Sequence, residues 1–196
     1  TSMRGLSLQT VVLQMNVTSS TTMVTMGENC RLEDCTLNLT CTGSTDNVVL
    51  KGVLFGGTSS QTSKLRTTVI SVRNSAMASS LTSTVYGIQA SGTGSFSESV
   101  FSFNSIKGST INVYSNGKGN KRCVIVTGSN QISLRDANLY IAPPTNTSST
   151  GSYVGVETAD SGNIGSAQLR TTTVGCVKPT SGQAYTASDI LQTNPA

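Results

Sequence analysis

The sequence predicts an all-β protein, a single-stranded right-handed parallel β-helix, and two observations lead to this prediction. The first is composition. Of the 196 residues, 30 are Ser and 29 are Thr, and charged residues make up only 11%. Together with recurring Val and Ile, such a composition favours short strands and turns over helices. The second is a repeated sequence pattern, which a stack of similar coils explains and an antiparallel fold does not require.

One eight-residue pattern recurs along the chain. Each copy begins with an apolar residue, continues with a polar pair and a small residue, and ends in alternating apolar positions. The copies span residues 32–39, 65–72, 96–103, 134–141 and 169–176. With a weaker copy at Leu50, the starting positions are 18, 15, 31, 38 and 35 residues apart. We therefore expect coils of about 15–19 residues, with further coils near 110–113 and 153–156.

Stacking of such coils aligns matching residues in inward columns, because side chains alternate between the two faces of a strand. One expected column contains Leu32, Leu50, Leu65, Phe96, Leu134 and Leu169. A second contains Leu37, Ile70, Phe101, Leu139 and Val174. A small residue interrupts the alternation in each unit, namely Cys35, Thr68, Ser99, Ala137 or Thr172. This interruption predicts a corner between strands on two faces of the β-helix.

An antiparallel jelly roll or sandwich is the alternative fold, since its strands also recur about every 8–12 residues. Repeated sequence at matching positions favours the β-helix. We expect residues 1–196 to form one β-helix domain, either a complete protein or a fragment of a longer chain.

The composition excludes several kinds of chemistry. The absence of histidine removes Ser-His-Asp and Cys-His catalytic groups and the common zinc sites. The 13 cations and 9 acids are spread too thinly for a nucleic-acid tract, and no apolar run is long enough for membrane insertion. We therefore expect no metal, cofactor, nucleic acid or membrane insertion. The five cysteines are expected to be small buried residues of a reduced protein, with one cross-strand disulfide within 30–41 as the alternative.

A carbohydrate-active β-helix enzyme needs two or three carboxylates close together. Asp34, Glu98 and Asp136 occupy the same slot of different units. That slot lies at the expected corner, where Asp and Thr stabilise turns, and the coils should separate the acids by roughly 10–20 Å. We therefore expect turn capping at these positions and no enzymatic activity.

Candidate ligand-binding residues lie in two places. Residues 116–122 read Asn-Gly-Lys-Gly-Asn-Lys-Arg, a turn signal with three cations, Lys118, Lys121 and Arg122. We expect an exposed tip that contacts an acidic glycan or an anionic neighbour in an assembly, with a solvated loop as the alternative. Tyr140 occupies an outward slot of its unit and is the tyrosine best placed to stack on a sugar.

Three segments carry a resemblance to known proteins: Tyr-Val-Gly-Val-Glu-Thr at 153–158, Ala-Gln-Leu-Arg-Thr-Thr-Thr at 167–173 and Ser-Asp-Ile-Leu-Gln-Thr at 188–193. They resemble repeat-rich surface proteins of large DNA viruses of protists and algae. In their β-helical character those proteins are similar to phage tailspikes, fibre heads and the pectin-lyase-like superfamily. The resemblance implies a structural component of the virion surface, a homotrimer assembled in the host cytoplasm, and it transfers no catalytic residue.

Three functions follow as expectations. The first is a virion surface fibre, spike or head domain that attaches to host glycans. The second is a capsid decoration (minor capsid) protein, whose partners are capsid subunits. The third, which we favour least, is a fragment of a carbohydrate-active β-helix enzyme.

Overall fold

The computed structural model describes residues 2–3, 5–56, 63–75, 80–92, 104–128, 132–142, 151–158, 167–170, 172–176 and 191–193. The regular structure of these residues consists of strands, and every strand pairing among them is parallel. Within this part of the chain, no helix has the length and apolar character needed to span a membrane. The prediction of an all-β chain is confirmed.

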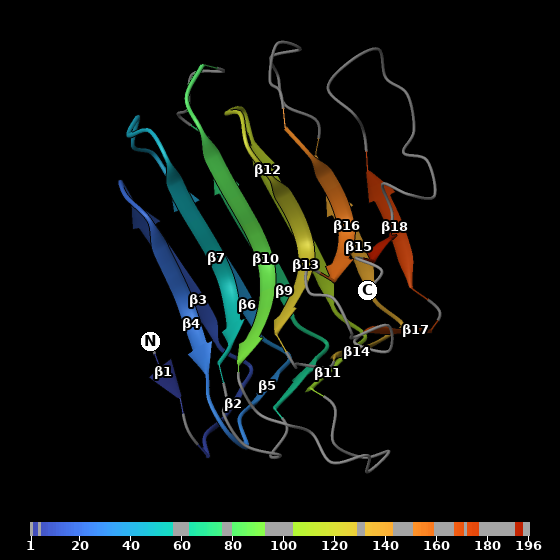
Figure 1. Cartoon of the computed structure of the whole chain (residues 1–196). Helices are drawn as coiled ribbons and strands as arrows, with labels where there is room; N and C mark the ends of the chain where they lie inside the picture. Colours follow the sequence, from blue (N-terminus) through green and yellow to red (C-terminus); the bar gives the residue numbers. More distant parts are fainter. Residues whose placement is uncertain are drawn as a thin grey trace.

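Three parallel sheets form the walls of the molecule, and successive coils follow one another from blue to red in Figure 1. Sheet A consists of β1 (Ser2–Met3), β4 (Thr21–Met26), β7 (Val48–Phe55), β10 (Ser83–Gly92), β13 (Lys121–Gly128), β16 (Tyr153–Thr158) and β19 (Leu191–Thr193). Sheet B consists of β2 (Ser7–Gln9), β5 (Arg31–Glu33), β8 (Lys64–Arg66), β11 (Asn104–Lys107), β14 (Ile132–Arg135) and β17 (Ala167–Arg170). Sheet C consists of β3 (Val12–Val17), β6 (Thr36–Cys41), β9 (Val69–Asn74), β12 (Thr110–Ser115), β15 (Asn138–Ile141) and β18 (Thr173–Cys176). The chain visits A, B and C in the same order in each coil, so the fold is a parallel β-helix, as predicted.

The length of each coil follows from the register of sheet B. Its central residues pair in the series Leu8, Leu32, Leu65, Ile106, Leu134 and Leu169. The differences between these numbers give coils of 24, 33, 41, 28 and 35 residues. The expected coil of 15–19 residues is therefore wrong, because one coil contains a strand of all three sheets. Residues 110–113 and 153–156 are not separate coils, since they belong to β12 and β16.

Most members of the expected inward columns are confirmed. Sheet B aligns four residues of the first column, and sheet C aligns the second as Leu13, Leu37, Ile70, Ile111, Leu139 and Val174. The placement of Leu50 is wrong, because β7 carries it into sheet A, where it pairs with Val85. Phe96 and Phe101 lie outside the described residues, and Ile106 and Ile111 hold the column positions of that coil.

A two-residue corner joins sheet B to sheet C. Its first residue has a positive φ, between 44° and 62°, at Thr10, Asp34, Thr67, Gly108 and Asp136. Its second residue is small and buried at Cys35, Thr68, Ser109 and Ala137. The corner expected from the interrupted alternation is confirmed at Cys35, Thr68 and Ala137. Ser99, expected at a further corner, lies outside the described residues.

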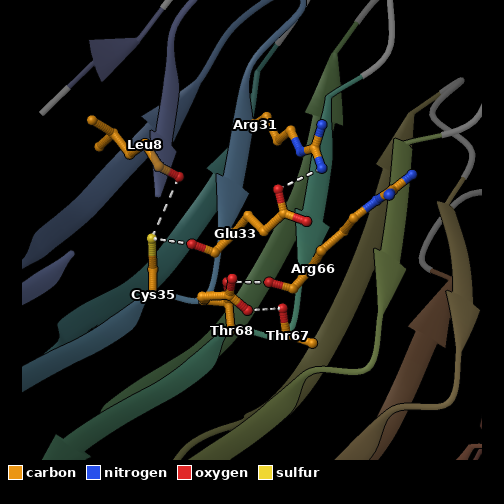
Figure 2. A network of polar contacts seen from close by, with 8 residues as sticks. Leu8, Arg31, Glu33, Cys35, Arg66, Thr67 and Thr68 are labelled. Atoms are coloured by element: carbon orange, nitrogen blue, oxygen red, sulfur yellow. Dashed lines mark hydrogen bonds and ion pairs between the residues drawn. The ribbon is translucent and has the colours of Figure 1, made fainter. Parts of the chain in front are cut away.

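Polar contacts within and between coils hold this corner, as Figure 2 shows. The Cys35 thiol donates to the carbonyls of Leu8 and Glu33, at 3.6 and 3.2 Å. The Thr68 hydroxyl donates to the Arg66 carbonyl at 2.8 Å. Backbone N–H groups of one corner also donate to carbonyls of the next coil, so the corners stack in register. Cys30, Cys35, Cys41 and Cys123 are buried, as expected.

Candidate functional site

A groove lies on the outer face of sheet C, where β9, β12 and β15 run side by side. Its volume is about 260 Å³, and its walls are formed by Ser71, Val72, Arg73, Asn112, Val113, Tyr114, Tyr140 and Ala142. The three strands β9, β12 and β15 are labelled in Figure 1.

The register of sheet C brings the polar side chains of the groove together. Asn112 pairs with Ser71 on one side and with Tyr140 on the other, so these three form one outward row. Arg73 and Tyr114 pair in the next outward row. The intervening valines are buried, as the two-residue period of a strand requires. The groove is thus a direct consequence of the alternating pattern in three strands.

The two tyrosines of the groove have different environments. The guanidinium carbon of Arg73 lies 4.8 Å from the ring centroid of Tyr114. The Tyr114 hydroxyl donates a hydrogen bond of 2.8 Å to Oδ1 of Asn116. Tyr140 is 41% exposed and is one of the most exposed large apolar side chains that the structure describes. The Tyr114 ring is therefore held by two contacts, and the Tyr140 ring is open to solvent.

This set of side chains suits a carbohydrate. A tyrosine ring offers an apolar face and a polar tip, so it contacts the C–H face of a sugar ring. Amide, hydroxyl and guanidinium groups at the same place donate and accept hydrogen bonds with sugar hydroxyls. The prediction that Tyr140 faces outward is confirmed, and it lies beside Asn112, which pairs with it in the sheet.

Lys118 is exposed, as expected, but it does not line the groove. Its backbone joins the 116–120 loop to the preceding coil. The Lys118 N–H donates to the Leu81 carbonyl at 2.7 Å, and the Lys118 carbonyl accepts from the Ser83 N–H at 2.6 Å. The side chain is thus presented by a loop whose main chain is fixed.

Lys121 is not on an exposed tip, and that expectation is wrong. It begins β13 and is fully buried, because its position in sheet A is an inward one shared with Leu50 and Val85. Its Nζ donates to the carbonyls of Gly117 and Gly119 and lies 5.0 Å from the centroid of the Tyr153 ring. Burial, reinforced by the neighbouring charge of Arg122, lowers the pKa of Lys121 to about 8.

Arg122 is also buried, contrary to expectation, although its position is outward. Only 4% of the residue is exposed. Its Nε contacts the Glu157 carboxylate, and its Nη1 donates to the carbonyls of Lys121 and Ser152, at 3.1 and 2.7 Å. These partners occupy the guanidinium. In the neighbouring strand, burial raises the pKa of Tyr86, although Arg122 opposes the rise. The three cations of residues 116–122 therefore do not form one exposed cluster.

The acidic slot has the geometry of a turn. Asp34 and Asp136 both occupy positive-φ corner positions, and Oδ1 of Asp34 accepts a 2.5 Å hydrogen bond from the Thr67 hydroxyl. Two intermediate corners, at Thr67 and Gly108, separate the acids, so three strand spacings of about 4.8 Å lie between them. Glu98 lies outside the described residues. Within the described part of the chain, no three His, Cys, Asp or Glu residues are grouped as metal ligands are.

Sequence reasoning missed Arg73 and Asn112, and it ranked Tyr114, one of the five tyrosines that could stack on a sugar, below Tyr140. The signal was present, since 69–74 and 110–115 both alternate apolar and polar residues. It could be used only with the register of β9 against β12, which the irregular coil lengths conceal. Comparison with known protein families, with curated proteins and with solved structures finds no match to this chain.

Proposed function

We propose that the chain is a non-enzymatic structural domain of a virion surface, a fibre or spike component that attaches to host glycans through the sheet C groove. The observation that carries the attachment is the exposed ring of Tyr140 in a groove with Asn112 and Arg73. The viral setting comes from the sequence resemblance at 153–158, 167–173 and 188–193.

The scaffold supports a binding role. Each coil stacks on the last with parallel strands, so the outer rows keep their spacing without a ligand. A site on regular strands positions its side chains better than a loop does. Two of the acids that the enzyme alternative requires lie at separate corners, which favours binding over hydrolysis.

Attachment to glycans is tested by a glycan array followed by titration calorimetry with the best neutral oligosaccharide. We expect Tyr140→Ala to abolish measurable binding or weaken it about tenfold, because stacking on the ring is lost. Val12→Ala is the matched control, since Val12 is an exposed outward residue of the same sheet, 70% exposed, outside the groove. Equal affinities for Tyr140→Ala and the unmodified protein would remove the groove from the proposal.

The oligomeric part of the proposal has its own test. A fibre or spike of the kind that the resemblance implies is a homotrimer. Light scattering on a sizing column gives the absolute mass in solution. A mass of three chains that persists in mild detergent supports the fibre or spike. A monomer contradicts it and directs the search to capsid subunits as partners.

A further inference from the structure

A row of cations crosses the outer face of sheet B. Register aligns one outward residue of each strand in the series Gln9, Glu33, Arg66, Lys107 and Arg135. Three consecutive coils therefore carry a cation at the same position. We call Arg66, Lys107 and Arg135 the basic ladder. At a strand spacing of about 4.8 Å, its first and last backbone positions are about 10 Å apart.

Charge along the ladder is only partly neutralised. Lys107 and Arg135 are exposed, and Arg66 is half-buried. Arg135 has an exposed acidic neighbour, Asp136, at 3.8 Å. Among the described residues, no carboxylate lies within 4.0 Å of a side-chain nitrogen of Arg66 or Lys107.

The acid closest to the ladder in the register already has a partner. Figure 2 shows Arg31 joined to Glu33, while the side chain of Arg66 extends away from the corner without such a link. In the neighbouring outward row, the exposed Lys64 pairs with Arg31 across the strands and adds a further cation to the face. The face as a whole therefore carries more positive charge than its acids balance.

Folding does not explain the ladder. Like charges directly opposite on neighbouring strands destabilise a sheet. Neighbouring backbone positions of the ladder are one strand spacing of about 4.8 Å apart, which is shorter than the screening length of about 8 Å at physiological ionic strength, so salt does not remove the repulsion between neighbours. The fold also accepts an uncharged residue at this position, because Gln9 occupies it in the first coil.

We propose that the basic ladder binds a linear acidic polysaccharide, whose sulfate or carboxylate groups meet successive cations across the strands. A regular row of cations at fixed spacing matches a polymer with regularly repeated anions. Ser133, in the adjacent outward row of β14, adds a hydroxyl donor beside Arg135. This site lies on a different sheet from the groove and does not depend on it.

A nucleic acid fits this face less well. Proteins that bind single strands combine cations with aromatic side chains on which the bases stack. The outward positions of β5, β8, β11 and β14 hold Arg, Glu, Lys and Ser and no aromatic residue, over the part of sheet B with described side chains. The described part of this face can therefore pair with the anions of a polymer, but it has no aromatic ring on which a base could stack.

The test measures fluorescence anisotropy of labelled heparin and labelled polygalacturonate, a sulfated and a carboxylated polysaccharide, at low salt. We expect Lys107→Gln to weaken binding about fivefold and the double variant Lys107→Gln/Arg135→Gln about 25-fold. Each substitution should also lower the slope of log Kd against the logarithm of the salt concentration by about one. Glutamine is chosen because Gln9 occupies the same row. Thermal denaturation checks that the variants remain folded, and removal of like charges should not lower Tm.

Lys51→Gln is the matched control, because it removes the same charge from the outer face of sheet A. Binding that survives in the double variant, or that falls equally in Lys51→Gln, would overturn the ladder as a specific site. An oligothymidylate that binds at least as tightly as heparin would overturn the choice of polysaccharide. Tyr140→Ala should leave heparin binding unchanged, and the ladder variants should leave neutral-glycan binding unchanged. Failure of the groove and failure of the ladder are therefore distinguishable.

Discussion

The guanidinium of Arg73 lies over the ring of Tyr114, 4.8 Å from its centroid, on two neighbouring strands of sheet C. The tyrosine is held in turn by the hydrogen bond from its hydroxyl to Asn116. The groove thus has an ordered cation and an ordered ring on one side and the exposed ring of Tyr140 on the other. Because the side chains of Arg73 and Tyr114 are already ordered, less conformational entropy is lost when a ligand binds.

The first prediction separates the ring of Tyr114 from its hydroxyl. Tyr114→Leu removes the cation–π contact, so we expect a loss of about 0.5–1 kcal/mol in the free energy of unfolding and weaker glycan binding. Tyr114→Phe keeps the ring and should retain most of both. Urea denaturation and calorimetry measure the two effects. If Tyr114→Phe were as damaging as Tyr114→Leu, the hydrogen bond to Asn116 rather than the ring would order this side of the groove.

The second prediction concerns the corners between sheets B and C. Gly108 has a φ of +62°, so Gly108→Ala should lower the free energy of unfolding by about 1–2 kcal/mol, although a Cβ there meets nothing closer than 3.4 Å. Thr10, a β-branched residue at φ 55°, should be stabilised by Thr10→Asn, because Asn tolerates this conformation. Gly56→Ala is the control, since the φ of Gly56 is not positive and its added Cβ has ordinary contacts. Equal effects of the two glycine substitutions would contradict the corner assignment.

Sequence reasoning succeeded for sheets B and C because their strands and the corner between them form one continuous repeated unit. The positions of Leu65 and Ile70 follow from the alternation and from the small residue between them. Coil length could not be obtained in this way, because the connections to sheet A vary in length. Leu50 was assigned to the wrong sheet for that reason, since an apolar residue with apolar neighbours fits the inner face of any of the three sheets.

Burial of Lys121 and Arg122 escaped sequence reasoning for a different physical cause. A run of Gly, Asn and cations is typical of an exposed turn. Whether a cation lies in the loop or in sheet A depends on where β13 begins, and β13 begins at Lys121. The cost of burying Lys121 is offset by two loop carbonyls and an aromatic ring, which the sequence does not bring together in any visible way. The groove was found only through Tyr140, because its other members depend on register between coils.

The third prediction tests the inward column of sheet B. Leu134 is fully buried between Ile106 and Leu169 in the register. Leu134→Ala should lower the free energy of unfolding by about 2–5 kcal/mol, and Leu134→Asp should prevent folding, because a carboxylate without a partner would be buried. Circular dichroism during heating provides the measurement. Ser133→Ala, at the adjacent outward position, should change stability by less than about 0.5 kcal/mol. A Leu134→Asp protein that melted like the unmodified chain would refute the column.

The fourth prediction follows from the lowered pKa of Lys121. In the unfolded chain the amine has its ordinary pKa of 10.5, and in the folded protein burial lowers the pKa to about 8. Between these values the unfolded chain binds more protons than the folded one, so the contribution of Lys121 to stability rises with pH across this window and is constant below it. Relative to a Lys121→Met variant, the unmodified protein should therefore gain stability between about pH 8 and about pH 10.5.

Urea denaturation at a series of pH values measures this difference between the two proteins. Tyr86, whose pKa is raised by burial, acts in the opposite direction above its ordinary value of 10.0, because its ionisation then favours the unfolded chain. It is present in both proteins, so its effect cancels in the difference. Lys118→Met controls for the loss of one positive charge near the same loop. A difference between the unmodified protein and Lys121→Met that stays flat over the window would mean that the ammonium of Lys121 is not held in the interior.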